Sequence, residues 1–133
     1  MVSGHCNCGA VRYEADVDVS DVYVCHCSIC RRFTGAGSIA VVVVPRSAFR
    51  WLSGSAEISR WKKPDADWEA CFCRCCGSAI PGDNDASTVY LPAGSISTGG
   101  ERLRVAHHLY VDSKAGWEQI GDQGEQHAEG LRR

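Results

Sequence analysis

The sequence predicts a mainly β domain, and three observations lead to that fold class. Short segments rich in valine and aromatic residues recur between turn residues about every 8–12 positions. A sustained apolar pattern with the helical period of 3.6 residues is missing. Nine cysteines fall in tight clusters with CxC and CxxC spacing, which is typical of zinc sites. We therefore expect one zinc-stabilised domain over residues 1–120, followed by a loose polar tail at 121–133.

The strands can be placed in order along the chain. Val11 and Tyr13 alternate with polar neighbours, as a half-buried strand requires, and valines alternate again between 17 and 25. Residues 39–44 suit a strand buried on both faces, which Pro45 ends. Two short strands are expected within 49–63, with Trp51, Ile58 and Trp61 as their packed positions. Further strands are expected at 68–73, 88–91 and 103–111, with a loop at 93–100. A helical turn is expected within 113–120, with Trp117 packed inward.

Composition and charge exclude several classes of partner. The formal net charge is −2, and lysines and arginines are dispersed, so we expect no nucleic acid partner and no anionic membrane partner. Residues 1–5 lack the pattern of a secretory signal, and the longest aliphatic run, 39–44, is too short to span a bilayer. The expectation is a cytoplasmic protein whose thiols bind metal rather than form disulfides.

Four cysteines from two distant segments can complete one metal site. Cys6 and Cys8 share a face of an extended chain, and Gly9 permits a turn directly after them. Cys73 and Cys76 form a CxxC turn with zinc-knuckle spacing. Together they supply the four sulfurs of a structural zinc site, although Cys71, Cys73 and Cys75 would share a face of an extended strand, which leaves the choice among them open.

A second cluster, Cys25, Cys27 and Cys30, supplies only three thiolates. A catalytic zinc often has three protein ligands and an open fourth position, which could take a soft ligand such as a substrate thiolate. His26 lies between two of the cysteines and should face away from them. The alternative is a second structural zinc completed by His26, Cys71, Cys75 or a distant histidine. We expect Cys71 and Cys75 to be non-ligating, with Cys75 exposed, and one of His107 and His108 to face inward.

Four motifs in this order resemble the glutathione-dependent formaldehyde-activating family, which includes centromere protein V. They cover most of the chain from residue 4 to 120, and together they are far more specific than any CxC alone. Cys71 and Cys75 are additional to the thiols of the family pattern, and the tail lacks the Leu-Pro ending common in it. The motifs are Gly4-His5-Cys6-Asn7-Cys8-Gly9-Ala10-Val11-Arg12-Tyr13, Cys25-His26-Cys27-Ser28-Ile29-Cys30-Arg31-Arg32 with Thr34-Gly35-Ala36, Phe72-Cys73-Arg74-Cys75-Cys76-Gly77-Ser78, and His108-Leu109-Tyr110-Val111-Asp112-Ser113-Lys114-Ala115-Gly116-Trp117.

This resemblance implies a β-tent fold of small coiled antiparallel sheets with two Zn²⁺ ions. It implies a structural site at Cys6, Cys8, Cys73 and Cys76, and a catalytic-type site at Cys25, Cys27 and Cys30. The activity that it implies is the condensation of glutathione with formaldehyde to S-hydroxymethylglutathione, classed as a carbon–sulfur lyase reaction.

The first hypothesis is therefore a zinc-dependent lyase or synthase that joins a small thiol to an aldehyde. The proton for the developing alkoxide could come from water, His26, His107, His108 or Asp112. The second hypothesis is a non-catalytic zinc module that binds a protein or a nucleic acid, and the third is thiol redox chemistry through Cys71 and Cys75. A homodimer is an open alternative to a monomer.

Overall fold

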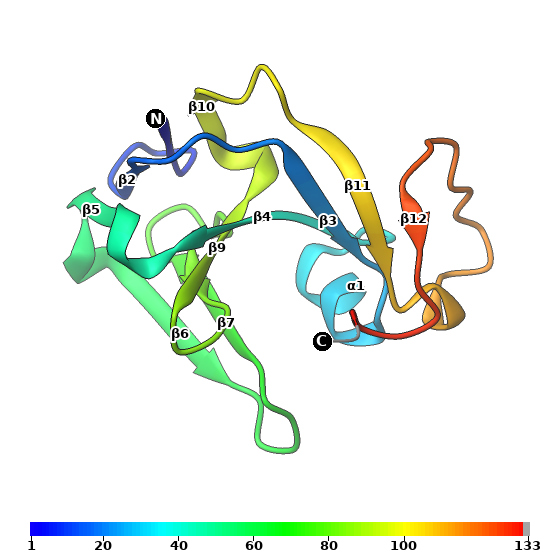
Figure 1. Cartoon of the computed structure of the whole chain (residues 1–133). Helices are drawn as coiled ribbons and strands as arrows, with labels where there is room; N and C mark the ends of the chain where they lie inside the picture. The colour runs from blue at the N-terminus through cyan, green and yellow to red at the C-terminus, as the bar shows by residue number, and fades with distance from the viewer. Residues whose placement is uncertain (132–133) are drawn as a thin grey trace.

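The computed structural model describes residues 1–131 and confirms the mainly β fold class (Figure 1). The first sheet has the strand order β10-β1-β2-β5 and the second the order β12-β11-β3-β4-β9-β8, while β6 and β7 form a separate hairpin. The strands are β1 (Val2–His5), β2 (Arg12–Ala15), β3 (Asp21–Cys25), β4 (Ile39–Pro45), β5 (Phe49–Ser53), β6 (Ile58–Lys62), β7 (Glu69–Cys73), β8 (Gly82–Asp83), β9 (Thr88–Pro92), β10 (Ile96–Thr98), β11 (Arg104–Leu109) and β12 (Glu125–Gln126). The helical elements are α1 (Ser28–Thr34) and the 3-10 turns η1 (Arg46–Ala48), η2 (Ser55–Glu57), η3 (Ala93–Ser95) and η4 (Val111–Ser113).

The main core lies where the two large sheets meet. Alternate residues of each strand point into it, because side chains of a strand alternate between its two faces. The buried cluster is Val2, Tyr13, Ala15, Val19, Val22, Val24, Val42, Val44, Val89 and Leu91. Strand β4 was expected to be buried on both faces, but only Val42 and Val44 are fully buried; Val41 on the other face lines a cavity described below.

A parallel pairing in the larger sheet fixes the position of the second cysteine cluster. Strands β3 and β11 run parallel, with Cys25 opposite Leu109, whereas β3 and β4 run antiparallel. The backbone N–H of His26 donates to the Leu109 carbonyl at 2.9 Å, and α1 begins two residues later. The second cluster therefore lies where β3 passes into α1 (Figure 1).

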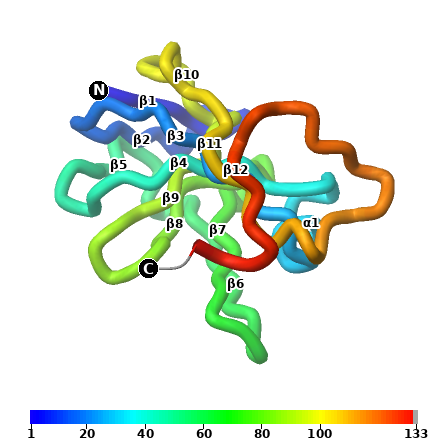
Figure 2. The backbone as a smooth tube through the Cα atoms, turned by 45° about the vertical axis from the view of Figure 1, so that its right-hand side comes forward, coloured from blue at the N-terminus to red at the C-terminus, as the bar shows by residue number. Residues whose placement is uncertain are grey.

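Several local expectations were wrong. Residues 93–100 form η3 and the edge strand β10 instead of a loop. Trp61 and Trp117 were expected to be packed, yet they are 53% and 73% exposed. Trp61 lies on β6, which within residues 1–131 pairs with β7 alone, and Figure 2 shows this hairpin projecting from the rest of the molecule. Helical structure near 113–120 is limited to η4.

The segment after residue 120 is not loose in the part that the structure describes. Strand β12 pairs in parallel with β11, and the His127 backbone N–H donates to the His108 carbonyl at 2.8 Å. A polar sequence can form such an edge strand because backbone groups alone make the pairing. Residues 132 and 133 of the expected tail lie outside the described residues. None of the helices within residues 1–131 has the length and hydropathy needed to cross a bilayer.

Candidate metal centres and the adjoining cavity

The four sulfurs expected in one site do converge. The sulfur atoms of Cys6, Cys8, Cys73 and Cys76 all lie within 4.8 Å of one another. The Cys8 sulfur is 3.6 Å from that of Cys6 and 3.8 Å from that of Cys73. A tetrahedral zinc with Zn–S bonds of about 2.3 Å places its sulfurs about 3.8 Å apart. The residues therefore fit a zinc ion in both donor type and spacing.

Two similar turns build this four-thiol cluster. Gly9 and Gly77 have φ values of 78° and 77°, a left-handed conformation that glycine adopts without strain. Their backbone N–H groups donate to the Cys6 and Cys73 carbonyls at 3.1 and 2.7 Å, which closes each turn behind its first cysteine. Cys6 and Cys73 are buried in a second small core, while Cys8 and Cys76 face solvent.

Hydrogen bonds also favour the ionised form of one ligand. The hydroxyl of Ser78 lies 3.2 Å from the Cys76 sulfur. This contact, together with the backbone N–H groups of Ser78 and Cys8, lowers the pKa of Cys76 to about 5. A thiolate is the form that binds metal, so the turn prepares Cys76 for that role.

The three-thiol cluster uses a single short segment instead. Cys25 ends β3, Cys27 caps the N-terminus of α1, and Cys30 is buried in the first turn of that helix. Their sulfurs also lie within 4.8 Å of one another. The Cys30 backbone N–H donates to the Cys27 sulfur over 3.4 Å, as an N-cap side chain accepts from the third residue of a helix.

The three thiols compete for negative charge. Hydrogen bonds from Cys25 and Cys30 lower the pKa of Cys27, and backbone N–H groups of Cys30 and Ile29 lower it further. The same contact with Cys27 raises the pKa of Cys25 to about 11, and contacts with Cys25 and Cys27 raise that of Cys30. On its own the cluster thus favours one thiolate, and a bound cation would favour ionisation of the other two thiols. This donor chemistry fits zinc.

None of the proposed fourth ligands joins this group among the described residues. His26 faces away from the sulfurs, as expected, and its Nε2 lies 2.8 Å from His108 Nδ1. Cys71 is buried beside Arg60, whose guanidinium donates to its sulfur at 3.2 Å. Cys75 is exposed and donates to Glu57 over 3.2 Å.

Behind the cluster, a chain of hydrogen bonds holds His26 in place. Glu118 lies 3.2 Å from His26 Nδ1, and Asp122 lies 2.8 Å from His108 Nε2. The hydrogen bond from His108 lowers the pKa of Asp122, so that carboxylate is ionised. These hydrogen bonds hold the His26 side chain, and with it the backbone between Cys25 and Cys27.

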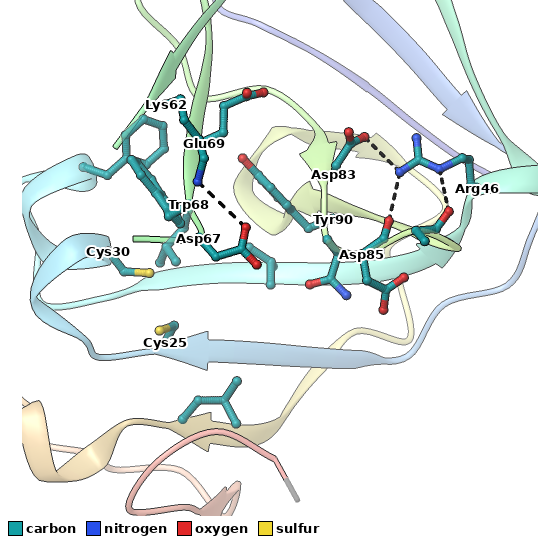
Figure 3. Close-up of a pocket in the computed structure, with 16 residues that line it drawn as sticks. Cys25, Cys30, Arg46, Lys62, Asp67, Trp68, Glu69, Asp83, Asp85 and Tyr90 are labelled. Carbon is teal, nitrogen blue, oxygen red and sulfur yellow. Dashed lines mark hydrogen bonds and ion pairs between the residues drawn. The ribbon is translucent and has the colours of Figure 1, made fainter. Parts of the chain in front are cut away.

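In front of the cluster, a cavity of about 640 Å³ is lined by Cys25 and Cys30 (Figure 3). This volume is within the range of small-molecule sites. Its apolar walls are formed by Phe33 of α1, Val41 of β4 and Trp68, the residue before β7. Its polar lining contains Arg46, Lys62, Asp67, Glu69, Asp83, Asn84 and Asp85.

Both basic side chains of the lining, Arg46 and Lys62, form ion pairs with acidic side chains. Arg46 lies 2.9 Å from Asp83, and Lys62 lies 3.8 Å from Asp67. Four acidic side chains line the cavity against these two basic ones, so the lining is acidic. A negatively charged ligand would have to displace these pairs.

Tyr90 is a functional candidate that sequence reasoning missed. It lines the cavity from β9, and Figure 3 shows its ring extending toward the β6–β7 hairpin, where its hydroxyl interacts with Cys71. Burial, followed by the nearby Cys71 and Cys30, raises the pKa of its phenol, so the hydroxyl stays protonated. The sequence marked residues 88–91 only as a strand, and a tyrosine in a strand gives no hint of a cavity. His107, His108 and Asp112 do not line this cavity.

Known proteins are similar to this chain in sequence and in fold. A putative glutathione-dependent formaldehyde-activating enzyme of Halomonas elongata is 28% identical over 130 residues, which cover 90% of this chain and 81% of that protein. The crystal structure of a Rhodobacter sphaeroides protein superposes with a TM-score of 0.57 at 21% identity, covering 75% of this chain and 92% of that one. Residues 1–113 match the family described as glutathione-dependent formaldehyde-activating enzyme. The chain therefore belongs to the glutathione-dependent formaldehyde-activating enzyme family.

Proposed function

We propose that the chain is a zinc-dependent carbon–sulfur lyase or synthase that adds a small thiol such as glutathione to an aldehyde such as formaldehyde. The observation that carries the proposal is the three-thiol cluster at the wall of a 640 Å³ cavity, with no fourth protein ligand among the described residues. In the same proposal, Cys6, Cys8, Cys73 and Cys76 hold a structural zinc. A cytoplasmic location and a homodimer stay predictions.

In this proposal Cys25, Cys27 and Cys30 would hold a second zinc, which supplies a cation that lowers the pKa of a coordinated thiol. In the synthetic direction the thiol loses its proton to solvent and its sulfur forms a bond with the carbonyl carbon. The carbonyl π electrons move to the oxygen, which then accepts a proton. The elimination direction reverses these steps.

Tyr90 is the residue that we assign to the carbonyl oxygen. Its phenol stays protonated because burial raises its pKa, so it can donate a hydrogen bond where negative charge develops. Phe33, Val41 and Trp68 provide apolar walls that strengthen this hydrogen bond by keeping water out. The histidine chain behind the cluster acts as a positioning element, since His26 is fully buried and points away from the cavity.

The acidic lining bears on the choice of thiol. Glutathione carries two carboxylates and one ammonium group, whereas the cavity offers two cations that are already paired with Asp83 and Asp67. A thiol with a free amine would match a lining of four acidic and two basic side chains better than an anionic thiol does. The reaction test therefore needs neutral and cationic thiols beside glutathione.

The test follows formaldehyde loss and adduct formation with glutathione, β-mercaptoethanol and cysteamine, with and without the zinc-loaded protein. We expect faster adduct formation with at least one thiol, and its loss in Cys27→Ser. Cys75→Ser is the matched control, because Cys75 is exposed and outside both clusters. Equal rates with and without the protein for the whole panel would overturn the proposal, and thiol binding without turnover would favour the non-catalytic zinc module.

A further inference from the structure

A third group of ligand-type side chains lies on β11 and β12, apart from both cysteine clusters. His107 on β11 is directly paired with Glu125 on β12, and His127 follows Glu125 by two residues. Directly paired residues and residues two apart in a strand share a face of the sheet. The pairing of β11 with β12 thus places the imidazole of His107, the carboxylate of Glu125 and the imidazole of His127 side by side.

The distances between their donor atoms match those around a bound metal ion. His107 Nδ1 lies 3.0 Å from His127 Nε2, and Glu125 Oε2 lies 3.8 and 3.9 Å from these two nitrogens. A triangle with these sides has one point in its plane that is about 2.1 Å from all three atoms, and this is the length of zinc–nitrogen and zinc–oxygen bonds. The three atoms are therefore close enough together to contact one ion.

The two histidines are held in place before any ion binds. The ring of His107 stacks on that of Tyr23 with centroids 5.2 Å apart and an interplanar angle of 16°. The backbone of His127 donates to His108 and accepts from the Val111 N–H at 3.0 Å. Their side chains are 24% and 21% exposed, whereas that of Glu125 is 70% exposed. The group is therefore partly buried on the imidazole side and open to solvent on the carboxylate side.

We propose that His107, Glu125 and His127 form a third metal site, one that takes a divalent cation with a preference for imidazole nitrogen, such as Zn²⁺. Water would complete its coordination, because three protein ligands leave at least one position open. The bound ion joins β12 to β11 and so fastens the end of the chain to the larger sheet. This site is independent of the proposed reaction.

A different arrangement of protons would account for the same contacts without a metal. Two imidazole nitrogens 3.0 Å apart can share one N–H, and Glu125 can act as a distant ion-pair partner. The two readings differ in stoichiometry, because only the first takes up an additional ion.

The test titrates Zn²⁺ into protein whose cysteine clusters are already saturated with zinc, using calorimetry and equilibrium dialysis. We expect one further ion per chain, with shifts of the imidazole C–H resonances of His107 and His127 but not of His5. His107→Ala and His127→Ala should each weaken this uptake by at least about 10- to 100-fold, which is the loss that removing an outer-shell partner alone causes. Gln126→Ala is the matched control, because its side chain alternates to the other face of β12, and it should bind as the wild type does.

The result that overturns the proposal is an unchanged zinc content, or an additional ion that binds equally well to both histidine variants. Equal weakening in Gln126→Ala would also overturn it, since that would show a general disturbance of the last strand. If a histidine variant does not fold, Glu125→Gln decides the question: this exposed residue keeps its shape but loses its charge, and the proposal requires weaker uptake there.

Discussion

The two cysteine clusters use the same ligand chemistry in opposite ways. The four-thiol cluster joins turns that lie 65 residues apart in sequence at Cys8 and Cys73, and it packs against a small core of its own. The three-thiol cluster comes from six consecutive residues at the junction of β3 and α1, and it faces a cavity. Ligands from distant segments make a metal site part of the fold, whereas ligands from one segment leave the fold complete without it and a side of the ion accessible.

The largest effect is expected from Cys73→Ser. Structural zinc contributes on the order of 10 kcal/mol, which is similar to the whole unfolding free energy of a typical domain. We expect this variant to lose its β-sheet circular dichroism and the zinc of the four-thiol cluster. Cys27→Ser should keep the sheet signal and lose only the other ion. A Cys73→Ser protein with wild-type thermal unfolding would remove the distinction between the clusters.

A large catalytic effect is expected from Tyr90→Phe. Loss of one hydrogen-bond donor to a developing oxyanion lowers kcat by about 10²- to 10³-fold. The fold should be unchanged, because phenylalanine keeps the ring that β9 presents to the cavity. Steady-state kinetics with the best thiol of the panel measure the effect. Tyr110→Phe is the control, since Tyr110 is exposed and does not line the cavity; if both variants are equally active, Tyr90 has no role in the reaction.

A chelator should remove zinc from the two cysteine clusters at different rates. The three-thiol cluster leaves a coordination position where a chelator can attack, whereas four thiols close the other site. We expect zinc release in two phases with rates at least about tenfold apart, equivalent to about 1.4 kcal/mol in barrier height. Circular dichroism should persist through the first phase and fall in the second. A single phase accompanied by unfolding would contradict the comparison.

The main core between the two large sheets also predicts a dependence on alkaline pH. Tyr13 is buried, and burial raises the pKa of its phenol. The folded state therefore disfavours the ionised form, so stability is complete below the unfolded pKa of about 10 and is lost as the pH rises toward the folded pKa. Tyr13→Phe should remove a slope of about 1.4 kcal/mol per pH unit from the unfolding free energy above pH 10. Denaturant titrations of both proteins measure the difference, and identical slopes would show that Tyr13 does not ionise on unfolding.

The smallest effect is expected from Cys75→Ser, which tests the redox hypothesis as well. Cys75 is exposed and contacts Glu57, whereas Cys71 is buried beside Arg60. We expect a change of at most about 0.5 kcal/mol in unfolding free energy, as for most surface substitutions. Thiol titration after mild peroxide should show no reversible loss of a pair of thiols in the wild type. Such a loss, abolished in Cys75→Ser, would revive the redox reading.

The sequence predicted the parts of this molecule that depend on local spacing. Alternating valines identified β3 and β4, and the CxC and CxxC spacings predicted which cysteines of one segment lie close together, because a short segment has few ways to arrange its own side chains. It did not predict what depends on how the sheets are placed. The exposure of Trp61 follows from the isolation of the β6–β7 hairpin, and the cavity position of Tyr90 follows from the pairing of β9 with β4. The pairing of β12 was hidden because its polar side chains leave no apolar pattern.

The distance along the chain between the two halves of the four-thiol cluster has a consequence for synthesis of the protein. A ribosome adds about 5–20 residues per second, so Cys6 and Cys8 precede Cys73, which lies 65 residues after Cys8, by about 3–13 s. During that interval the early cysteines are unpaired thiols on a growing chain, open to oxidation or to the wrong metal. Because Cys6 and Cys8 are synthesised before Cys73, correct folding depends on the availability of zinc, and not only activity does.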